Sequence, residues 1–227
     1  MRGEGHGSGE LFTFQLSNRM AETIGDALLV IISAPSGGGK TTLCQKILET
    51  NPNVVRAITC TTRPAREGER DGIDYYFLEE TSFLKRVQAG EFLEHATVHG
   101  NHYGTLRGEV FERLKKGRDV LLSIDVQGAA TVRAKAQKDP DLRKALVTVF
   151  VTPPSIAVLA ERLKKRATDS PDTIEKRLSV ARREIAEWVN YDYLIISATI
   201  SEDVRRMQAI LTAEKMRQCR ARPPLAE

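Results

Sequence analysis

A glycine-rich run that ends in lysine and threonine is the part of the sequence best suited to chemistry. It reads Ala34-Pro35-Ser36-Gly37-Gly38-Gly39-Lys40-Thr41-Thr42 and fits the pattern G-x-x-x-x-G-K-[ST], except that alanine replaces the first glycine. In this pattern backbone N–H groups surround phosphate oxygens, the lysine reaches the β- and γ-phosphates, and the threonine hydroxyl binds Mg²⁺. All nine residues are predicted to bind a nucleoside triphosphate, with Lys40 as a catalytic cation and Thr41 as the Mg²⁺ ligand.

The segments on either side of this run supply the strand and the helix that a phosphate loop needs. Residues 27–32 are continuously apolar, and Leu43, Ile47 and Leu48 fall on one face of a helix. A helix that begins at the loop adds its partial positive charge where the phosphates bind. This context favours a phosphate loop over a flexible linker.

Apolar strand-like runs and helical patterns alternate along most of the chain. The strand-like runs cover 28–32, 54–58, 120–124, 146–151 and 194–196. The helical patterns cover 108–116, 155–166, 173–188 and 202–217. This alternation predicts a three-layer αβα fold, with helices on both faces of a central parallel sheet and a ligand site at the carboxyl ends of its strands.

Two stretches interrupt the alternation. Residues 59–105 combine short strand candidates, turn residues and a helical pattern at 82–89, which predicts an inserted mixed α/β lobe. Residues 162–177 join two helical runs across Pro171, which predicts a helical lid. The remaining core is expected to comprise residues 25–58, 106–161 and 178–219, between a flexible N-terminal extension (1–24) and a flexible C-terminal tail (220–227).

Composition narrows the class of protein. The chain has 227 residues and a formal net charge of +4, but its basic residues are dispersed and lack interleaved aromatic residues, so nucleic acid is not an expected partner. It has no apolar run of about 20 residues and no signal-peptide pattern, so we expect a cytoplasmic protein without a membrane partner. Three scattered cysteines, Cys44, Cys60 and Cys219, favour reduced thiols over disulfides or a zinc site.

A second motif lies in the predicted lobe. It reads Thr59-Cys60-Thr61-Thr62-Arg63-Pro64-Ala65-Arg66-Glu67-Gly68-Glu69 and continues as Gly72-Ile73-Asp74-Tyr75-Tyr76-Phe77. Together with the phosphate loop, this stretch resembles the guanylate kinase family, whose acceptor lobe carries T-T-R-x-x-R-x-G-E…G-x-D-Y-x-F. The resemblance covers residues 28–217 through segments 91–94, 100–105, 124–128, 153–155, 162–166 and 191–193.

The resemblance implies a P-loop nucleoside monophosphate kinase. Its activity would be Mg²⁺-dependent transfer of the γ-phosphoryl group of ATP to GMP or dGMP, as part of purine nucleotide metabolism. The partners would then be the small molecules ATP and GMP, and the oligomeric state is left open.

Several side chains in the lobe suit a purine monophosphate. Arg63 and Arg66, joined by the Tyr75 hydroxyl, can clamp a phosphate, because guanidinium groups bind its oxygens bidentately. Guanine presents N1–H and N2–H donors, and the carboxylate of Glu94 would accept hydrogen bonds from both. The resemblance adds further residues around the base: Thr59, Tyr103, Thr105 and Asp125.

Cations of the predicted lid would complete the site. Arg162 and Arg166 are four residues apart and share a helix face, while Arg177 lies beyond Pro171. With Lys40 they are expected to stabilise the charge that develops during phosphoryl transfer. A general base is not needed, because the attacking phosphate already carries anionic oxygens.

Other side chains are interpreted as structural. His95, His99 and His102 fall within eight residues, but further ligands in fixed geometry are not evident, so we predict no zinc site. Trp188 is expected to belong to the apolar core.

Four departures from the family pattern leave alternatives open. They are Ala34 in the phosphate loop, Ser123 for an aspartate, Ala167 for a lid glycine, and Ser197-Ala198 for Asn-Asp after the last strand. One alternative is an inactive guanylate-kinase-like interaction module, which would not need Lys40 and Thr41. The other is a kinase for a different nucleoside monophosphate, and the choice between the two substrates depends on Glu94.

Overall fold

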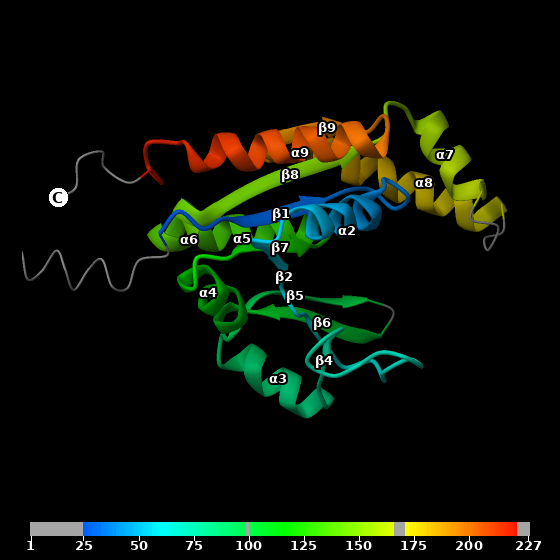
Figure 1. The fold of residues 1–227 in the computed structure, drawn as a ribbon. Coiled ribbons are helices and arrows are strands. Elements are labelled where there is room, and N and C mark those ends of the chain that lie inside the picture. Colours follow the sequence, from blue (N-terminus) through cyan, green and yellow to red (C-terminus); the bar gives the residue numbers. More distant parts are fainter. Residues whose placement is uncertain (1–24, 99, 166–170, 222–227) are drawn as a thin grey trace, which may run out of the picture.

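A five-stranded parallel sheet forms the centre of the molecule (Figure 1). The computed structural model describes residues 25–98, 100–165 and 171–221. The strand order is β2-β7-β1-β8-β9, and each neighbouring pair is parallel. The strands are β1 (Leu29–Ser33), β2 (Val54–Arg56), β7 (Asp119–Ser123), β8 (Leu146–Thr152) and β9 (Tyr193–Ile196).

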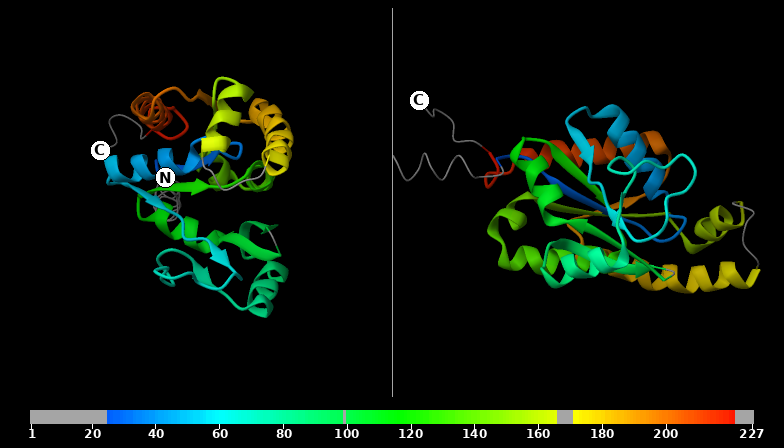
Figure 2. Two further views of the ribbon diagram at one scale, coloured as in Figure 1. Left: turned by 90° about the vertical axis from the view of Figure 1, so that its right-hand side faces the viewer. Right: turned by 90° about the horizontal axis from the view of Figure 1, so that it is seen from below.

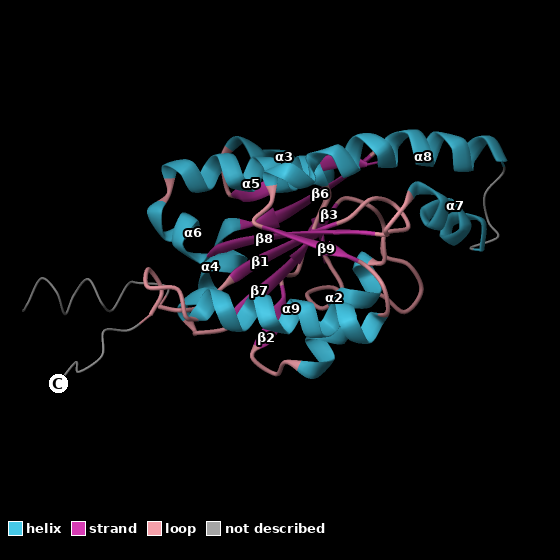
Figure 3. Ribbon diagram, turned by 90° about the horizontal axis from the view of Figure 1, so that it is seen from above, coloured by secondary structure: helices cyan, strands magenta, loops and turns pink. Residues whose placement is uncertain are grey.

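Side chains in and beside β1 alternate between two apolar cores. Leu29 and Ile31 belong to the core under α4 (Arg107–Lys115) and α5 (Val126–Lys138), which α6 (Pro140–Ala145) extends. Val30 and Ile32 belong to the core under α2 (Lys40–Thr50) and α9 (Ile200–Lys215). Figure 3 shows the sheet between α2 and α9 on one side and α5 on the other. The predicted three-layer fold is therefore confirmed.

A smaller sheet lies below the core in Figure 1. Its order is β4-β3-β6-β5, in which β3 and β4 are parallel and the other pairs antiparallel. The strands are β3 (Cys60–Thr61), β4 (Tyr76–Phe77), β5 (Phe92–Val98) and β6 (Asn101–Leu106). Helix α3 (Glu80–Gln88) covers this sheet and buries Phe83 against Cys60 and Phe92. Burial of mixed elements in a separate apolar cluster agrees with an inserted lobe.

Two helices project beside the carboxyl ends of the main strands (Figure 2). Helix α7 (Ile156–Lys165) and helix α8 (Pro171–Ala186) pack together through an apolar cluster of their own that includes Leu159, Leu163 and Ala181. Helix α8 begins at Pro171, as the predicted break requires. Arg166 and Ala167 lie outside the described residues, as do the proposed extension at 1–24 and most of the proposed tail. The domain boundaries drawn from the sequence stay a prediction.

One core prediction was wrong. Trp188 lies in a single 3₁₀ turn, η1 (Glu187–Asn190), and its residue is 45% exposed. The turn leaves α8 at the molecular surface, so hydrophobicity alone misplaced this side chain.

Cys44 and Cys60 are buried and Cys219 is exposed, each as a free thiol. Within the described ranges, none of the helices combines the length and apolarity needed to cross a bilayer.

Candidate functional site

The glycine-rich loop joins the end of β1 to the start of α2, at the carboxyl edge of the sheet. Gly39 has φ +95°, a conformation that other residues rarely adopt. A Cβ atom at Gly38 would come within 2.9 Å of the Pro35 carbonyl oxygen, whose hydrogen bond to the Gly38 N–H is 2.8 Å long. Ala34 occupies the first position of the pattern with its residue buried in the α2 and α9 core. The loop therefore keeps a compact turn in front of a helix N-terminus, where anions bind.

Lys40 begins α2 and is directed across the loop. Its Nζ donates a hydrogen bond of 3.0 Å to the carbonyl oxygen of Ile124, just beyond β7. Burial lowers the pKa of Lys40, and the neighbouring Cys44, Asp125 and Glu184 oppose that effect. A partly buried ammonium group beside the N–H groups at the start of a helix is suited to binding phosphate oxygens.

Glu184 of α8 is a loop contact that the sequence reasoning missed. Its carboxylate accepts a hydrogen bond from the backbone N–H of Ser36, and burial raises its pKa. The Oε2 atom is buried without a hydrogen-bond partner among the described residues. Beside it, a cavity of about 560 Å³ separates the start of α5 from α8. That cavity is lined by Asp125, Val126, Gln127, Ala130, Val180, Arg183, Glu184 and Glu187.

A second cavity, of about 330 Å³, opens on the other side of the loop. It is lined by Gly37, Gly39, Thr42, Arg162, Ser197, Ala198, Ile200 and Asp203. Nη1 of Arg162 is 3.8 Å from the position that a Cβ atom would take at Gly39. Asp203, which the sequence reasoning also missed, accepts 2.7 Å and 3.3 Å hydrogen bonds from the Ser197 hydroxyl and the Ala198 N–H. The departures at 197 and 198 thus lie in a pocket adjoining the phosphate loop.

Glu94 brings a buried carboxylate to the junction of the lobe and the core. It lies on β5 and is 5% exposed, and the hydroxyl of Thr105 on β6 donates to its Oε1 over 2.7 Å. Burial raises the pKa of Glu94, and the nearby Asp125 adds to that effect. A Cβ atom at Gly128 of α5 would lie 3.2 Å from Oε2, so glycine leaves room for the carboxylate.

Asp125 connects the two halves of the site. It follows β7 and caps α5 by accepting a 2.8 Å hydrogen bond from the Gly128 N–H. Its charge acts on both Lys40 and Glu94. The end of one central strand therefore places an acid between the phosphate loop and the lobe carboxylate.

Arg63, Tyr75 and Tyr103 form a second group in the lobe. Arg63 pairs with both carboxylate oxygens of Glu69, over 3.0 Å and 2.9 Å, and also hydrogen-bonds to Tyr103. Its guanidinium carbon is 5.5 Å from the centre of the Tyr75 ring, and the Tyr75 and Tyr103 rings are 6.3 Å apart. Arg66 is exposed, with its backbone N–H bound to Glu69. Arg63, Tyr75 and Tyr103, three of the eight predicted GMP contacts, are therefore adjacent.

The other predicted site residues are dispersed around these groups. Thr59 is half-buried before β3, Thr41 is exposed on the first turn of α2, and Arg177 is half-buried on α8. Arg166 lies outside the described residues.

One histidine of the lobe has a packing role. His102 stacks on Phe83 with ring centres 5.3 Å apart and hydrogen-bonds to Thr97 over 3.0 Å. His95 is exposed on β5, and His99 is not among the described residues.

Comparisons with known proteins agree on one family. The model of the guanylate kinase family matches residues 26–214. A guanylate kinase of Carboxydothermus hydrogenoformans is 46% identical over 190 residues, which cover 84% of this chain and 90% of that protein. A guanylate kinase of Symbiobacterium thermophilum is 43% identical over 88% of this chain and 92% of its own length. The crystal structure of guanylate kinase from Anaplasma phagocytophilum superposes with a TM-score of 0.66 at 36% identity, over 88% of this chain and 92% of that one.

Proposed function

Because the chain belongs to the guanylate kinase family, we propose that it transfers the γ-phosphoryl group of ATP to GMP or dGMP, giving ADP and the corresponding diphosphate. The observation that carries this proposal is the buried carboxylate of Glu94, held by Thr105 and facing Gly128 at the edge of the phosphate-loop core. A triphosphate site alone would suit many enzymes, whereas this carboxylate selects the acceptor.

The chemistry of the purine edge explains the selection. An ionised Glu94 would accept hydrogen bonds from the N1–H and N2–H groups of guanine, and Thr59 and Thr105 would supply hydroxyl groups to the base. Adenine has no donor at N1 and would leave the buried carboxylate with no donor from the base, only that of Thr105, which costs about 1–3 kcal/mol or more for a charged group. Tyr103 and Asp125 then border the base.

The acceptor phosphate would bind at a second group of lobe side chains. Arg63, Arg66 and Tyr75 supply two guanidinium groups and a hydroxyl for its oxygens. The bidentate pair between Arg63 and Glu69 supports this assignment, because it shows that the guanidinium group can bind two oxygens of one anionic group, and a phosphate would replace the carboxylate there. We infer that the lobe at 59–105 carries GMP as a unit.

Transfer depends mainly on alignment and on charge. The loop from Ala34 to Thr42 holds the ATP phosphates, and Lys40 with Arg162, Arg166 and Arg177 offsets the charge on the transferring group. The exposed Thr41 hydroxyl at the start of α2 is an oxygen donor of the type that Mg²⁺ prefers. When bound with ATP, Mg²⁺ supplies electrostatic stabilisation of the phosphate oxygens. The lid at 162–177 would exclude water from the γ-phosphate.

A coupled assay of ADP release tests the proposal directly. GMP, dGMP, AMP, UMP and CMP are offered separately with MgATP, and turnover is expected with GMP and dGMP. Preference for AMP or a pyrimidine nucleotide would contradict the assignment of Glu94, and absence of turnover with every acceptor would indicate an inactive interaction module. The proposed setting is the cytoplasm, within purine nucleotide metabolism.

A further inference from the structure

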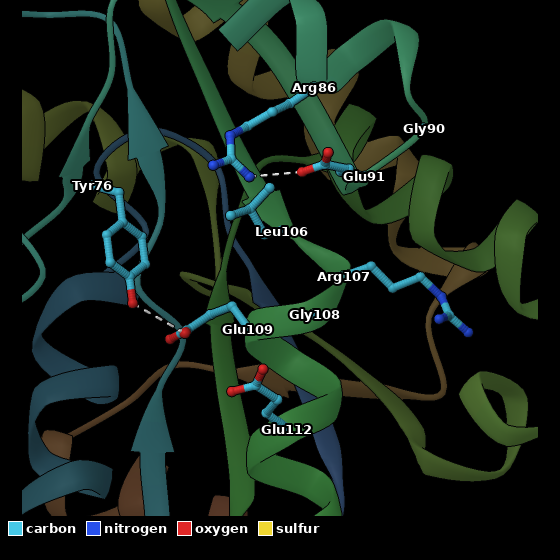
Figure 4. Close-up of a pocket in the computed structure, with 9 residues that line it drawn as sticks. All are labelled: Tyr76, Arg86, Gly90, Glu91, Leu106, Arg107, Gly108, Glu109 and Glu112. Carbon is cyan, nitrogen blue, oxygen red and sulfur yellow. Dashed lines mark hydrogen bonds and ion pairs between the residues drawn. The ribbon is translucent and has the colours of Figure 1, made fainter. Parts of the chain in front are cut away.

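The chain passes between core and lobe twice, and one side chain joins the two passages. The first passage comprises residues 57–59, between β2 and β3, and the second is the junction of β6 with α4 at Leu106. Glu109 lies in the first turn of α4, just after the second passage. Figure 4 shows its carboxylate directed at the Tyr76 hydroxyl of the lobe.

The carboxylate of Glu109 has a partner in three different segments. Its Oε1 accepts a 3.1 Å hydrogen bond from the Ile58 N–H in the first passage, and its Oε2 accepts a 3.3 Å bond from the Tyr76 hydroxyl of β4. Arg113, one turn later on α4, balances the charge, with Nη2 2.6 Å from Oε1. The Glu109 side chain is only 12% exposed. Both oxygens are therefore engaged in a largely dehydrated place, where hydrogen bonds to a charged group are strong.

The partners of Glu109 are neighbours of the proposed GMP contacts. Ile58 immediately precedes Thr59, and Tyr76 immediately follows Tyr75. The backbone also links these segments, because the Tyr76 N–H donates to the Thr59 carbonyl oxygen over 3.0 Å. A shift of the carboxylate would consequently move a proposed base contact and a proposed phosphate contact together.

Helix α4 provides a fixed reference for this contact. Its Val110, Phe111 and Leu114 are buried in the main core against the central sheet. Beside Glu109, however, a cavity of about 450 Å³ lies between this helix and the lobe (Figure 4). Its walls include Tyr76, Arg86 and Glu91 from the lobe and Glu109 and Glu112 from α4. Across this space the bond between Tyr76 and Glu109 is a direct link from lobe to core.

We propose that Glu109 is a positioning residue for the acceptor nucleotide, which holds Thr59 and Tyr75 in place through Ile58 and Tyr76. This inference rests on the proposed phosphorylation of GMP. Its physical basis is preorganisation: when the bond is absent, GMP binding must order these segments itself.

The first test is Tyr76→Phe, which removes the hydroxyl and keeps the ring. We expect the KM for GMP to rise about 3- to 10-fold, the usual effect of one lost hydrogen bond, while the KM for ATP stays unchanged and kcat falls less than about twofold. Glu109→Ala should raise the KM for GMP further, because it also releases Ile58. In the Glu109→Ala background, Tyr76→Phe should have no further effect, which a double-mutant cycle measures.

Glu112→Gln is the matched control, because Glu112 lies on the same helix and borders the same cavity but is exposed. It should leave both KM values at those of the unmodified protein. The inference is overturned if Tyr76→Phe leaves the KM for GMP unchanged or lowers it, if both KM values rise equally, or if the effects of Tyr76→Phe and Glu109→Ala simply add. Turnover of GMP by the unmodified protein separates these results from a failure of the proposed function.

Discussion

Arg63 and Glu69 form a bidentate ion pair, with Nη1 3.0 Å from Oε2 and Nη2 2.9 Å from Oε1. A carboxylate with two oxygens presents the same spacing to a guanidinium group as two oxygens of a phosphate do. The pair thus fixes the position of the Arg63 guanidinium group, and a phosphate bound bidentately at the same face would replace Glu69.

We predict that Arg63→Lys impairs GMP binding although it conserves the charge. A lysine ammonium cannot make two parallel hydrogen bonds, so we expect the KM for GMP to rise about 10-fold or more and the KM for ATP to stay unchanged. Steady-state kinetics with each substrate varied in turn measure both values. Arg70→Lys, at an exposed position of the same loop, should behave as the unmodified protein, and an equal effect of the two substitutions would count against Arg63.

Lys40→Ala should lower kcat strongly, with only a small loss of folding stability. The lost ammonium interacts with phosphate oxygens as charge redistributes, and loss of one such group costs about 100- to 1,000-fold in rate. Lys46→Ala serves as the control, because Lys46 is on the same helix in an exposed ion pair with Glu49. Single-turnover rates decide the matter: a reduction below tenfold for Lys40→Ala would exclude the assigned role.

Glu94→Gln should weaken GMP binding and raise the melting temperature at pH 7. Burial raises the pKa of Glu94 above its ordinary value of 4.5, so its folded-state contribution is fully present below that value and is lost as pH rises through the raised pKa. The neutral amide avoids this loss, and the variant should melt at a higher temperature than the unmodified protein at pH 7 and at a similar one near pH 4. Thermal unfolding at the two pH values measures the difference.

The same variant should bind GMP about 10- to 100-fold more weakly, because two hydrogen bonds lose their charged acceptor. Discrimination between GMP and AMP should fall in proportion. Glu112→Gln, an exposed glutamate, should change neither melting temperature nor selectivity. A Glu94→Gln protein that is less stable at pH 7, or that keeps full base preference, would refute the interpretation of the buried carboxylate.

Gly128→Ala tests the space beside Glu94. The added methyl group would lie 3.2 Å from Oε2 of Glu94 and 3.3 Å from Cδ1 of Ile124, while Thr105 holds the other carboxylate oxygen. We expect the KM for GMP to rise several-fold without loss of stability, since alanine favours a helix over glycine by about 1 kcal/mol. Gly108→Ala, where a Cβ atom would meet no heavy atom within 4 Å, should leave the KM unchanged. Equal KM values in both variants would show that Glu94 adapts without consequence.

Patterns within the sequence were sufficient to predict the framework of the fold. The runs 28–32 and 120–124 are apolar apart from Ser123 because both faces of the central sheet are covered, and they appear as β1 and β7 with shifts of one residue. Helix α5 was not predicted, because its buried face consists of Gly128, Ala129, Val132 and Ala136 and contrasts little with the rest of the helix.

Contacts between distant segments explain what the sequence did not reveal in the site. Glu184 reaches Ser36 from the last turns of α8, and nothing in the local pattern distinguishes it from other acidic residues on a solvated helix. Asp203 accepts a hydrogen bond from Ser197, and the local sequence likewise gives no sign of this contact. Trp188 illustrates the opposite error, since a large apolar side chain does not ensure burial when the chain turns at the surface.

The apolar cluster shared by α7 and α8 lies against the glycine-rich loop. Leu163 and Leu159 of this cluster would lie 3.0 Å and 3.2 Å from a Cβ atom at Gly37, so the bare α-carbon of that glycine forms the surface on which the two leucines rest. Any movement of α7 and α8 relative to the loop must shift the two leucine side chains across Gly37. The hydrogen-exchange rates of the backbone amides in the glycine turn should therefore change together with those in α7 and α8. One deuterium-labelling experiment would report the motion of both.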